Sequence, residues 1–241
     1  MIIYNEKDRI TYYDLGMNGK PRLSALIKKI QTAADYNARD LGIGYAVLAP
    51  LGISFVLNQF ALSINSLPEY DQEVFISTWP DSVTKGTFLR KGKMTNLNGI
   101  TLVEWASKWI LFNINERRIL RPKDLPAELT GCGDQGVKIM PEKVLIKEAE
   151  QTLKAEYVHY VSYSDCDTNM HMNNAVYADL IENVINLDGV SDFGFGNKVN
   201  INYQNEIRPG EEVTVRVFES GGGLVVQGKC GDRVGFSAGI L

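Results

Sequence analysis

The sequence has 241 residues, of which 44% are hydrophobic and 22% are charged. That length allows one large domain or two small ones, and the hydrophobic content is enough for a sizeable core. The formal net charge of −4 argues against a nucleic-acid-binding protein, because such proteins need a predominantly basic field.

No segment is predicted to cross a membrane or to act as a signal peptide. The most apolar run, residues 46–57, is too short for a transmembrane helix and contains Pro50 and Gly52. The N-terminal residues lack a basic region followed by an apolar core. We therefore expect no stable insertion into a membrane.

The cysteines and histidines limit the chemistry that the chain can support. Cys132, Cys166 and Cys230 are far apart and form no CxxC pair, which is typical of a protein of the reducing cytoplasm. The only histidines are His159 and His171, so a metal site is not expected, and no cofactor is expected either.

A helix is predicted after Gly19 and Pro21, ending at the stretch 42–44. Its apolar residues recur at steps of three and four, as on one face of a helix. They are Leu23, Leu26, Ile27, Ile30, Ala34 and Leu41.

Strand-like runs follow this helix and are separated by turn-forming sequences. The runs cover residues 55–65, 73–79, 88–96 and 102–113, and the turns lie at 67–71, 85–86 and 98–99. A long helix followed by an antiparallel meander is an α+β pattern, because parallel strands would need repeated crossover helices.

The second half of the chain repeats this order of elements. A strand is predicted over 157–162 and strands over 198–207, 212–219, 223–230 and 234–240. The helix between them carries Val176, Leu180, Ile181, Val184 and Leu187 and is predicted to stop at Asp188–Gly189. Turns with proline, at Pro68 and Pro209, are 141 residues apart. We therefore predict two similar units, 1–130 and 152–241, joined by a connector over 131–151, with each helix wrapped by its own sheet.

The polar stretch before the second helix has the strongest catalytic pattern. Asp167, Asn169 and His171 are spaced two residues apart, and the Asn173–Asn174 pair follows directly. In an extended segment, alternate side chains lie on one side, roughly 7 Å apart. The spacing therefore predicts a carboxylate, an amide and an imidazole delivered together to a helix N-terminus.

This stretch resembles the signature of the plant and bacterial thioesterases that act on fatty acyl-acyl carrier protein. The signature reads Asp-x-Asn-x-His-x-Asn-Asn-x-x-Tyr and matches residues 167–177. The first half is similar at residues 67–70, 85–86, 105–113 and 117–118. The likeness extends from about Leu15 to the end of the chain. It implies two tandem hotdog units, each a long central helix wrapped by an antiparallel sheet.

The resemblance also implies a fourth catalytic residue, Glu206, in a strand that reads Tyr-x-x-Glu. Simple alternation along residues 199–206 places Glu206 with the polar positions, away from a face packed on the helix. A bulge could re-aim it, or that polar face could itself be buried. Ile207 stands where many plant members have a cysteine, so the resemblance excludes a cysteine nucleophile here.

The implied activity is hydrolysis of the fatty acyl-acyl carrier protein thioester, which releases free fatty acid and ends chain elongation. Asp167 would act on water as a general base or attack the carbonyl directly, and His171 would orient the water or donate the proton. Asn169 would hold the substrate, and N–H groups near Asn173–Asn174 would bind the carbonyl oxygen. The sequence leaves open whether Asp167 or Glu206 activates the water.

Purely structural interpretations of these residues also exist. Asp167 and Asn169 are residue types favoured in turns and at helix caps, and Asn173–Asn174 are expected to cap the helix. His159 has no motif around it and is expected on a strand surface. Cys166 is expected to be a buried structural thiol rather than a nucleophile.

The substrate would need an apolar slot for its chain and a basic surface for its protein part. The first half, which lacks the polar motif, is expected to bind the acyl chain, with Ile53, Phe55 and Leu57 as possible lining residues or plain core residues. Acyl carrier protein is acidic, so docking calls for a basic patch. Two clusters are candidates: Lys85, Arg90, Lys91 and Lys93, and Arg117, Arg118, Arg121 and Lys123.

Three other functions remain open at this stage. They are a hotdog thioesterase for acyl-CoA, a hotdog dehydratase or hydratase, and a non-catalytic acyl-binding module. A complete Asp167, Asn169 and His171 set argues against the last, because a lipid sensor would not need all three. The protein is expected to be a monomer or a homodimer, with one active site per pair of hotdog units.

Overall fold

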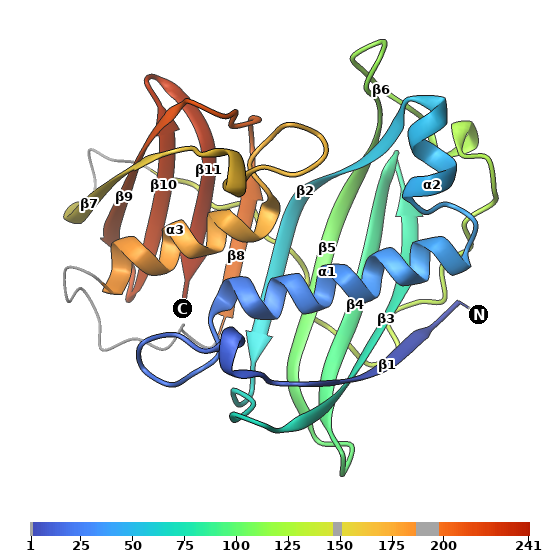
Figure 1. The fold of residues 1–241 in the computed structure, drawn as a ribbon, viewed down its shortest axis with the longest axis horizontal. Helices are drawn as coiled ribbons and strands as arrows, with labels where there is room; N and C mark the ends of the chain where they lie inside the picture. Colours follow the sequence, from blue (N-terminus) through green and yellow to red (C-terminus); the bar gives the residue numbers. More distant parts are fainter. Residues whose placement is uncertain (1, 147–150, 187–197) are drawn as a thin grey trace. The chain divides into compact units, whose positions relative to one another are not determined.

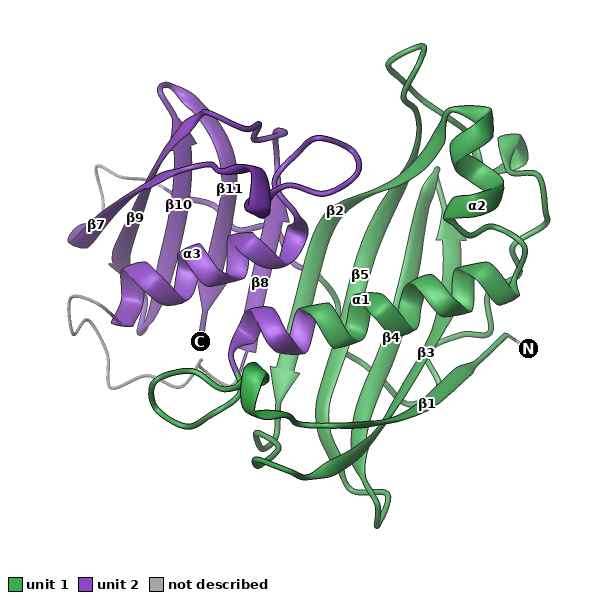
Figure 2. Ribbon diagram, in the orientation of Figure 1, with its two compact units in different colours: residues 1–21, 28–141 green, residues 22–27, 142–241 purple. Residues whose placement is uncertain are grey.

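The computed structural model describes residues 2–146, 151–186 and 198–241, and it divides into two compact units (Figure 2). Unit 1 comprises residues 1–21 and 28–141, and unit 2 comprises residues 22–27 and 142–241. The division at Pro141 and Glu142 falls inside the segment 131–151 that was predicted as a connector. No helix among the described residues is both long and apolar enough to cross a membrane.

Unit 1 is an antiparallel sheet with most of a long helix, α1 (Leu23–Asp40), lying across it (Figure 1); the residues of α1 up to Ile27 belong to unit 2. The strand order is β1-β3-β4-β5-β2, and β6 pairs with β5. The strands are β1 (Tyr4–Arg9), β2 (Ile53–Ile64), β3 (Glu73–Thr84), β4 (Thr87–Asn96), β5 (Thr101–Asn113) and β6 (Arg118–Ile119). The short helices are α2 (Tyr45–Leu48) and the 3-10 turns Tyr12–Asp14, Ala49–Leu51 and Pro122–Asp124.

Unit 2 repeats this arrangement with a shorter helix, α3 (Asn174–Asn186), across its sheet (Figure 1). Its strand order, β7-β9-β10-β11-β8, matches that of unit 1 strand for strand. The predicted α+β duplication is therefore confirmed. The strands are β7 (Thr152–Tyr160), β8 (Lys198–Tyr203), β9 (Glu212–Ser220), β10 (Gly223–Cys230) and β11 (Arg233–Ile240), and a 3-10 turn spans Tyr163–Asp165.

Most predicted elements are found within a few residues of their expected bounds. The predicted end of the second helix, at Leu187 and Asp188–Gly189, lies outside the described residues. The predicted strand 198–207 ends earlier, at Tyr203. Strand β1 was not predicted, because its sequence is mostly charged; it is an edge strand, where charged residues discourage pairing with other chains.

The C-terminus of α1 is built by a glycine in the left-handed region. Gly42 has a φ of 74°, and the N–H of Ile43 donates to the Ala38 carbonyl at 2.9 Å. This is the pattern in which a glycine after the last turn satisfies free carbonyls of the helix. It confirms the helix stop that the stretch 42–44 predicts.

Residues 131–141 pack against unit 1 and do not form a free linker. The N–H groups of Cys132 and Gly133 donate to the carbonyls of Pro80 and Asp81 at 3.0 and 3.1 Å. Lys91 is only 4% exposed, and its ammonium donates to the Val137 carbonyl at 2.7 Å. The boundary of unit 1 therefore lies about ten residues beyond position 130.

A partly buried carboxyl group caps the first turn of α1, in the part of that helix that belongs to unit 2. Glu182 on α3 accepts a hydrogen bond from the Leu23 N–H at 3.0 Å, so it satisfies a donor that the helix leaves free. Burial raises the pKa of Glu182 to about 7, and Asp179 acts in the same direction. The hydrogen bonds from Leu23 and Ser24 and the positive charge of Arg22 oppose that rise.

The raised pKa of Glu182 predicts a dependence of stability on pH. Between the ordinary pKa of 4.5 and about 7, the folded state holds a proton that the unfolded state has released. The free energy of unfolding should therefore fall as pH rises through this window. Glu182→Gln stays neutral and should become more stable than the unaltered protein by about 1–3 kcal/mol at pH 8, with little difference at pH 4.5. Urea unfolding of both proteins from pH 4.5 to 8 measures this, and parallel pH profiles would contradict it.

Candidate functional site

Residues 166–172 form a tight loop at the entrance to α3. Cys166 and Met172 pair across its base, and the Asp167 N–H donates to the His171 carbonyl at 3.0 Å. The Met170 N–H donates to the Asp167 carbonyl at 2.9 Å, and Met170 has a φ of 59°. The chain therefore reverses direction here, and the prediction of an extended segment with three side chains on one edge is wrong.

Within the loop, Asp167 contributes to the turn. Its Oδ1 accepts the Asn169 N–H at 2.8 Å, which is the local side-chain bond typical of Asp in turns. Among the residues that the structure describes, no hydrogen bond involves Asp167 Oδ2. Asn169 lies exposed at the tip of the loop. Asp167 is thus a turn residue that still has one carboxylate oxygen available.

Unit 1 contains the same loop at the entrance to α1. Leu15 and Pro21 pair across its base, and the Gly16 N–H donates to the Lys20 carbonyl at 2.8 Å. The Gly19 N–H donates to the Gly16 carbonyl at 3.0 Å, and its φ of 71° corresponds to that of Met170. Two identical hydrogen-bond patterns therefore start the two long helices.

The two loops differ in their chemistry. Gly16, Asn18 and Lys20 occupy the positions that Asp167, Asn169 and His171 occupy in unit 2. Because the unit 1 loop forms without a carboxylate, the loop shape alone does not require Asp167. Turn formation is therefore not a sufficient explanation for a carboxylate and an imidazole at these positions.

The structure brings His171 and Glu206 together. His171 Nε2 lies 3.0 Å from Glu206 Oε2, and the two side chains are 29% and 39% exposed. Arg208 Nη2 also contacts Glu206 Oε2, at 3.2 Å. A carboxylate on one ring nitrogen fixes the orientation of the imidazole and which of its nitrogens carries the proton.

Strand β8 ends at Tyr203, so the alternation of side chains along it does not extend to Glu206. After Tyr203, the N–H groups of Gln204 and Asn205 both donate to the Gly235 carbonyl, at 2.9 and 3.1 Å. Two successive donors to one acceptor break the two-residue alternation, as in a bulge. Glu206 therefore lies beyond the strand, where its side chain can turn towards His171.

An arginine holds the backbone of this turn. Arg233 Nη1 donates to the Glu206 carbonyl, and Arg233 Nη2 pairs with the Glu211 carboxylate. The same carboxylate accepts the Arg208 N–H at 2.6 Å. The segment that carries Glu206 is thus fixed by charged groups on both sides.

His159 has a partner that the sequence interpretation missed. His159 lies on β7 with a partly exposed side chain, as expected for a strand surface, and its Nε2 lies 2.9 Å from Asp165 Oδ2. Asp165 also accepts the Ser162 N–H on Oδ2 at 2.8 Å and the Asn173 N–H on its carbonyl at 2.8 Å. The signal was present as Ser-x-x-Asp, a spacing that caps a helical turn. The contact between His159 and Asp165 therefore links β7 to the turn that precedes the loop.

The two asparagines at the start of α3 have different roles. Asn173 caps the helix, because its Oδ1 accepts the Ala175 N–H at 2.9 Å. Asn174 is the first helical residue, and its carbonyl accepts the Tyr203 hydroxyl at 3.2 Å. The Asn173 N–H is already bonded to Asp165, whereas the Asn174 N–H has no acceptor among the residues that the structure describes. Of the two N–H groups, that of Asn174 is available to a substrate oxygen.

Cys166 is a free, partly buried thiol rather than a fully buried one. Burial raises its pKa, and the charges of Asp165 and Asp167 raise it further. A raised pKa disfavours the thiolate, which is the nucleophilic form. The structure therefore gives no support to Cys166 as a nucleophile.

An aromatic cluster supports the first turns of α3. The Tyr177 ring lies edge-on to Tyr203 at 5.1 Å and to Phe236 at 5.2 Å, distances typical of favourable aromatic pairs. Phe236 in turn occupies space that Gly228 on β10 leaves open: a Cβ there would be 2.0 Å from the ring. The packing around Tyr177 thus depends, through Phe236, on a glycine on the strand next to β11.

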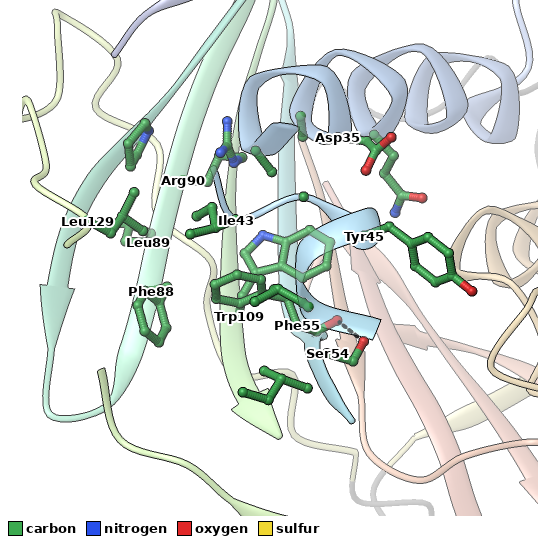
Figure 3. Close-up of a pocket in the computed structure, with 17 residues that line it drawn as sticks. Asp35, Ile43, Tyr45, Ser54, Phe55, Phe88, Leu89, Arg90, Trp109 and Leu129 are labelled. Atoms are coloured by element: carbon green, nitrogen blue, oxygen red, sulfur yellow. Dashed lines mark hydrogen bonds between the residues drawn. The ribbon is translucent and has the colours of Figure 1, made fainter. Parts of the chain in front are cut away.

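Unit 1 contains an apolar pocket of about 220 Å³ (Figure 3). Ile53 and Phe55 line it, together with Phe88 and Trp109, as expected for an acyl-binding site. Leu57, the third residue proposed as a liner, is buried and is not part of the wall. The pocket wall also contains one guanidinium group, that of Arg90.

Only one of the two predicted basic clusters is a surface patch. In the first cluster, Lys91 is buried beside Asp81 at 3.7 Å and Arg90 lines the pocket, so the prediction of a docking patch there is wrong. The residues of the second cluster are all exposed: Arg117, Arg118, Arg121 and Lys123.

Two repeated units in one chain, each with a long helix across an antiparallel sheet of the same strand order, define the double-hotdog class of protein. The family model for the acyl-ACP thioesterase N-terminal domain matches residues 2–129, and that for the C-terminal domain matches residues 146–227. The chain belongs to the acyl-ACP thioesterase family, where ACP is acyl carrier protein. It is a thioester hydrolase that acts on fatty acyl-acyl carrier protein and releases the fatty acid.

Solved structures of similar fold cover nearly the whole chain. An acyl-ACP thioesterase from Bacteroides thetaiotaomicron is 19% identical with a TM-score of 0.86, over 99% of this chain and 97% of the other. A putative oleoyl thioesterase from Lactobacillus plantarum is 22% identical with a TM-score of 0.81, over 99% and 94%. The 12:0-ACP thioesterase from Umbellularia californica is 15% identical with a TM-score of 0.82, over 100% and 96%. A comparison with curated protein sequences found no match.

The close approach of Gly228 and Phe236 predicts a specific loss of stability. Gly228→Ala forces the Phe236 ring or the strand to move and should lower the free energy of unfolding by about 1–3 kcal/mol. Gly239→Ala on the neighbouring strand is the matched control, since its Cβ would meet only Val144 at 3.5 Å. Urea unfolding of both variants measures the difference, and equal effects would show that the aromatic packing tolerates the extra methyl group.

Proposed function

We propose that the loop of unit 2 hydrolyses the thioester with His171 and Glu206 as its acid–base pair. The 3.0 Å contact between His171 Nε2 and Glu206 Oε2 is the observation that supports this assignment. With the Nε2–H donated to Glu206, the lone pair on His171 Nδ1 can accept a proton from water. The water then attacks the carbonyl carbon, and its proton passes to Nδ1.

The remaining steps use groups at the start of α3. The oxygen of the tetrahedral intermediate would accept the free N–H of Asn174 and the side-chain amide of Asn169. The carbon–sulfur bond then breaks, and the proton on His171 Nδ1 passes to the leaving thiolate. Cleavage thus releases one carboxylic acid and one thiol, with the imidazole returned to its starting state.

Asp167 has two possible roles in this scheme. Its Oδ2 could take the proton of the attacking water in place of His171 Nδ1 and pass it to the thiolate. Alternatively, Oδ2 attacks the carbonyl carbon and the thiolate leaves; water then hydrolyses the mixed anhydride, His171 takes the proton of that water, and the proton passes to the thiolate. Only the second route links the acyl group covalently to the protein. Mass measurement of the intact protein after rapid quenching distinguishes the routes, because the anhydride adds the mass of the acyl group.

The acid–base assignment predicts large losses of activity. Glu206→Gln, His171→Ala and Asp167→Asn should each lower kcat by about 10²–10⁴-fold. The last two remove a proton-transfer or nucleophilic group, and the first removes the carboxylate that orients the imidazole. Lys20→Ala, at the position of unit 1 that corresponds to His171, should leave kcat unchanged. Release of free thiol from acyl-acyl carrier protein measures kcat. Full activity in His171→Ala or Glu206→Gln would overturn the assignment.

We further propose that unit 1 binds the acyl chain and that unit 2 carries out the chemistry. The apolar wall of the unit 1 pocket, and a loop there without a carboxylate or an imidazole, support this division. The three unpaired cysteines fit a reducing compartment, so we propose the cytoplasm as its location.

Docking of the acidic carrier protein is proposed at the exposed cluster of residues 117–123. Arg121→Glu and Lys123→Glu should lower kcat/KM for acyl-acyl carrier protein by about tenfold at low salt, because charge complementarity mainly raises the rate of association. Activity on the acyl-CoA of the same chain length should change much less. Lys28→Glu, an exposed change on α1, is the control.

The same measurement tests the alternative of an acyl-CoA thioesterase. Equal losses on both thioesters would exclude docking at residues 117–123. A higher kcat/KM for the CoA thioester in the unaltered protein would favour acyl-CoA as the substrate.

A further inference from the structure

The unit 1 pocket contains a charge that binding of a plain hydrocarbon chain does not explain. Arg90, on β4, is partly buried in a wall that is otherwise mostly apolar and aromatic. Figure 3 shows its side chain near α1, beside Ile43, with Phe55 and Trp109 around the same space. A guanidinium in such surroundings loses much of its hydration, which is costly unless an anion or good acceptors replace the water.

The partners of Arg90 within the protein are neutral. Its Nη1 donates to Asn37 Oδ1 at 2.8 Å and to Thr78 Oγ1 at 3.2 Å. Its Nε and Nη2 form no hydrogen bond to any residue that the structure describes, yet neither atom is closed off from solvent. Two nitrogens of the guanidinium, with three N–H groups between them, therefore remain available to a ligand.

No carboxylate of the described residues forms an ion pair with Arg90. Asp35 also lines the pocket but is exposed and makes no such contact. The adjacent Lys91, by contrast, has Asp81 at 3.7 Å. Burial lowers the pKa of Arg90 to about 10, so the group is still charged at neutral pH. The pocket thus combines apolar walls with a cation that has no countercharge of its own.

We propose that this pocket binds a free fatty acid, with the hydrocarbon chain against the apolar wall and the carboxylate on Arg90. A carboxylate matches the fork of a guanidinium and supplies the missing negative charge. The choice of a fatty chain rests on the proposed function, whereas the need for an anion follows from the pocket itself. The product of thioester hydrolysis would then be a ligand of unit 1, recognised by a group that an uncharged acyl chain does not engage.

Direct binding tests this proposal on the full-length protein. Titration calorimetry with dodecanoate, methyl dodecanoate and dodecanol compares three ligands that share a chain and differ at the head. The acid should bind at least about tenfold more tightly than the ester or the alcohol, because only the acid forms charge-assisted hydrogen bonds. Equal affinities for the three ligands would overturn the proposal.

Variants then locate the carboxylate. Arg90→Gln removes the charge but keeps an amide donor for Asn37, and it should abolish the preference for the acid. Lys93→Gln removes a charge from the same strand outside the pocket and should keep the preference. If the preference survives in Arg90→Gln and is lost in His171→Ala, the carboxylate is bound at the loop of unit 2 and the proposal is wrong.

The outcome is independent of whether the protein hydrolyses thioesters. Should Arg90→Gln fail to fold, His171→Ala decides instead: a preference for the acid that survives in this variant supports the Arg90 site, and a preference that is lost overturns it. Active hydrolysis with equal binding of acid and ester overturns the Arg90 site and leaves the proposed function intact. Binding of the acid through Arg90 without any hydrolysis would support the Arg90 site and overturn the proposed function.

Discussion

The backbone hydrogen bond from the Asp167 N–H to the His171 carbonyl is the constraint on which the site depends. It closes a loop whose base is the Cys166–Met172 pair and whose far end leads directly into α3. The imidazole is then held by Glu206, from the end of β8. Secondary structure supplies rigid ends on both sides, and the reactive groups lie on short connections between them, as is common in enzymes.

The duplication separates what the fold needs from what the chemistry needs. Both units start their long helix with the same loop, and in unit 1 that loop forms with Gly16 and Lys20. The side chains of Asp167 and His171 are therefore additions to a backbone that is stable without them. Unit 1, without those additions, has an apolar pocket, and the two units differ in chemistry while they share one strand order.

Periodicity predicted the helices and most strands well, because each buries one face and its turns carry glycine, proline or asparagine. It missed β1, whose charged residues give no apolar alternation. At the site, spacing identified Asp167 and His171 but not their geometry, because a φ of 59° at Met170 cannot be read from residue types. The direction of the Glu206 side chain depends on the two hydrogen bonds to the Gly235 carbonyl, and the position of Arg90 in the pocket wall depends on tertiary packing. Neither of these contacts can be predicted from the residues next to Glu206 or Arg90 in the sequence.

Met170 has a consequence for the dynamics of the loop. A residue with a Cβ in the left-handed region costs roughly 1–2 kcal/mol relative to the usual conformation, and glycine at the corresponding Gly19 avoids that cost. The loop that carries Asp167 and His171 thus stores backbone strain, whereas the corresponding loop of unit 1 has glycine at this position. Segments of lower local stability open by local fluctuations, which need less free energy than unfolding of the whole protein. The amide protons that close the unit 2 loop should therefore exchange with solvent faster than their counterparts in unit 1, so that conformational breathing is concentrated where a substrate must enter and a product must leave.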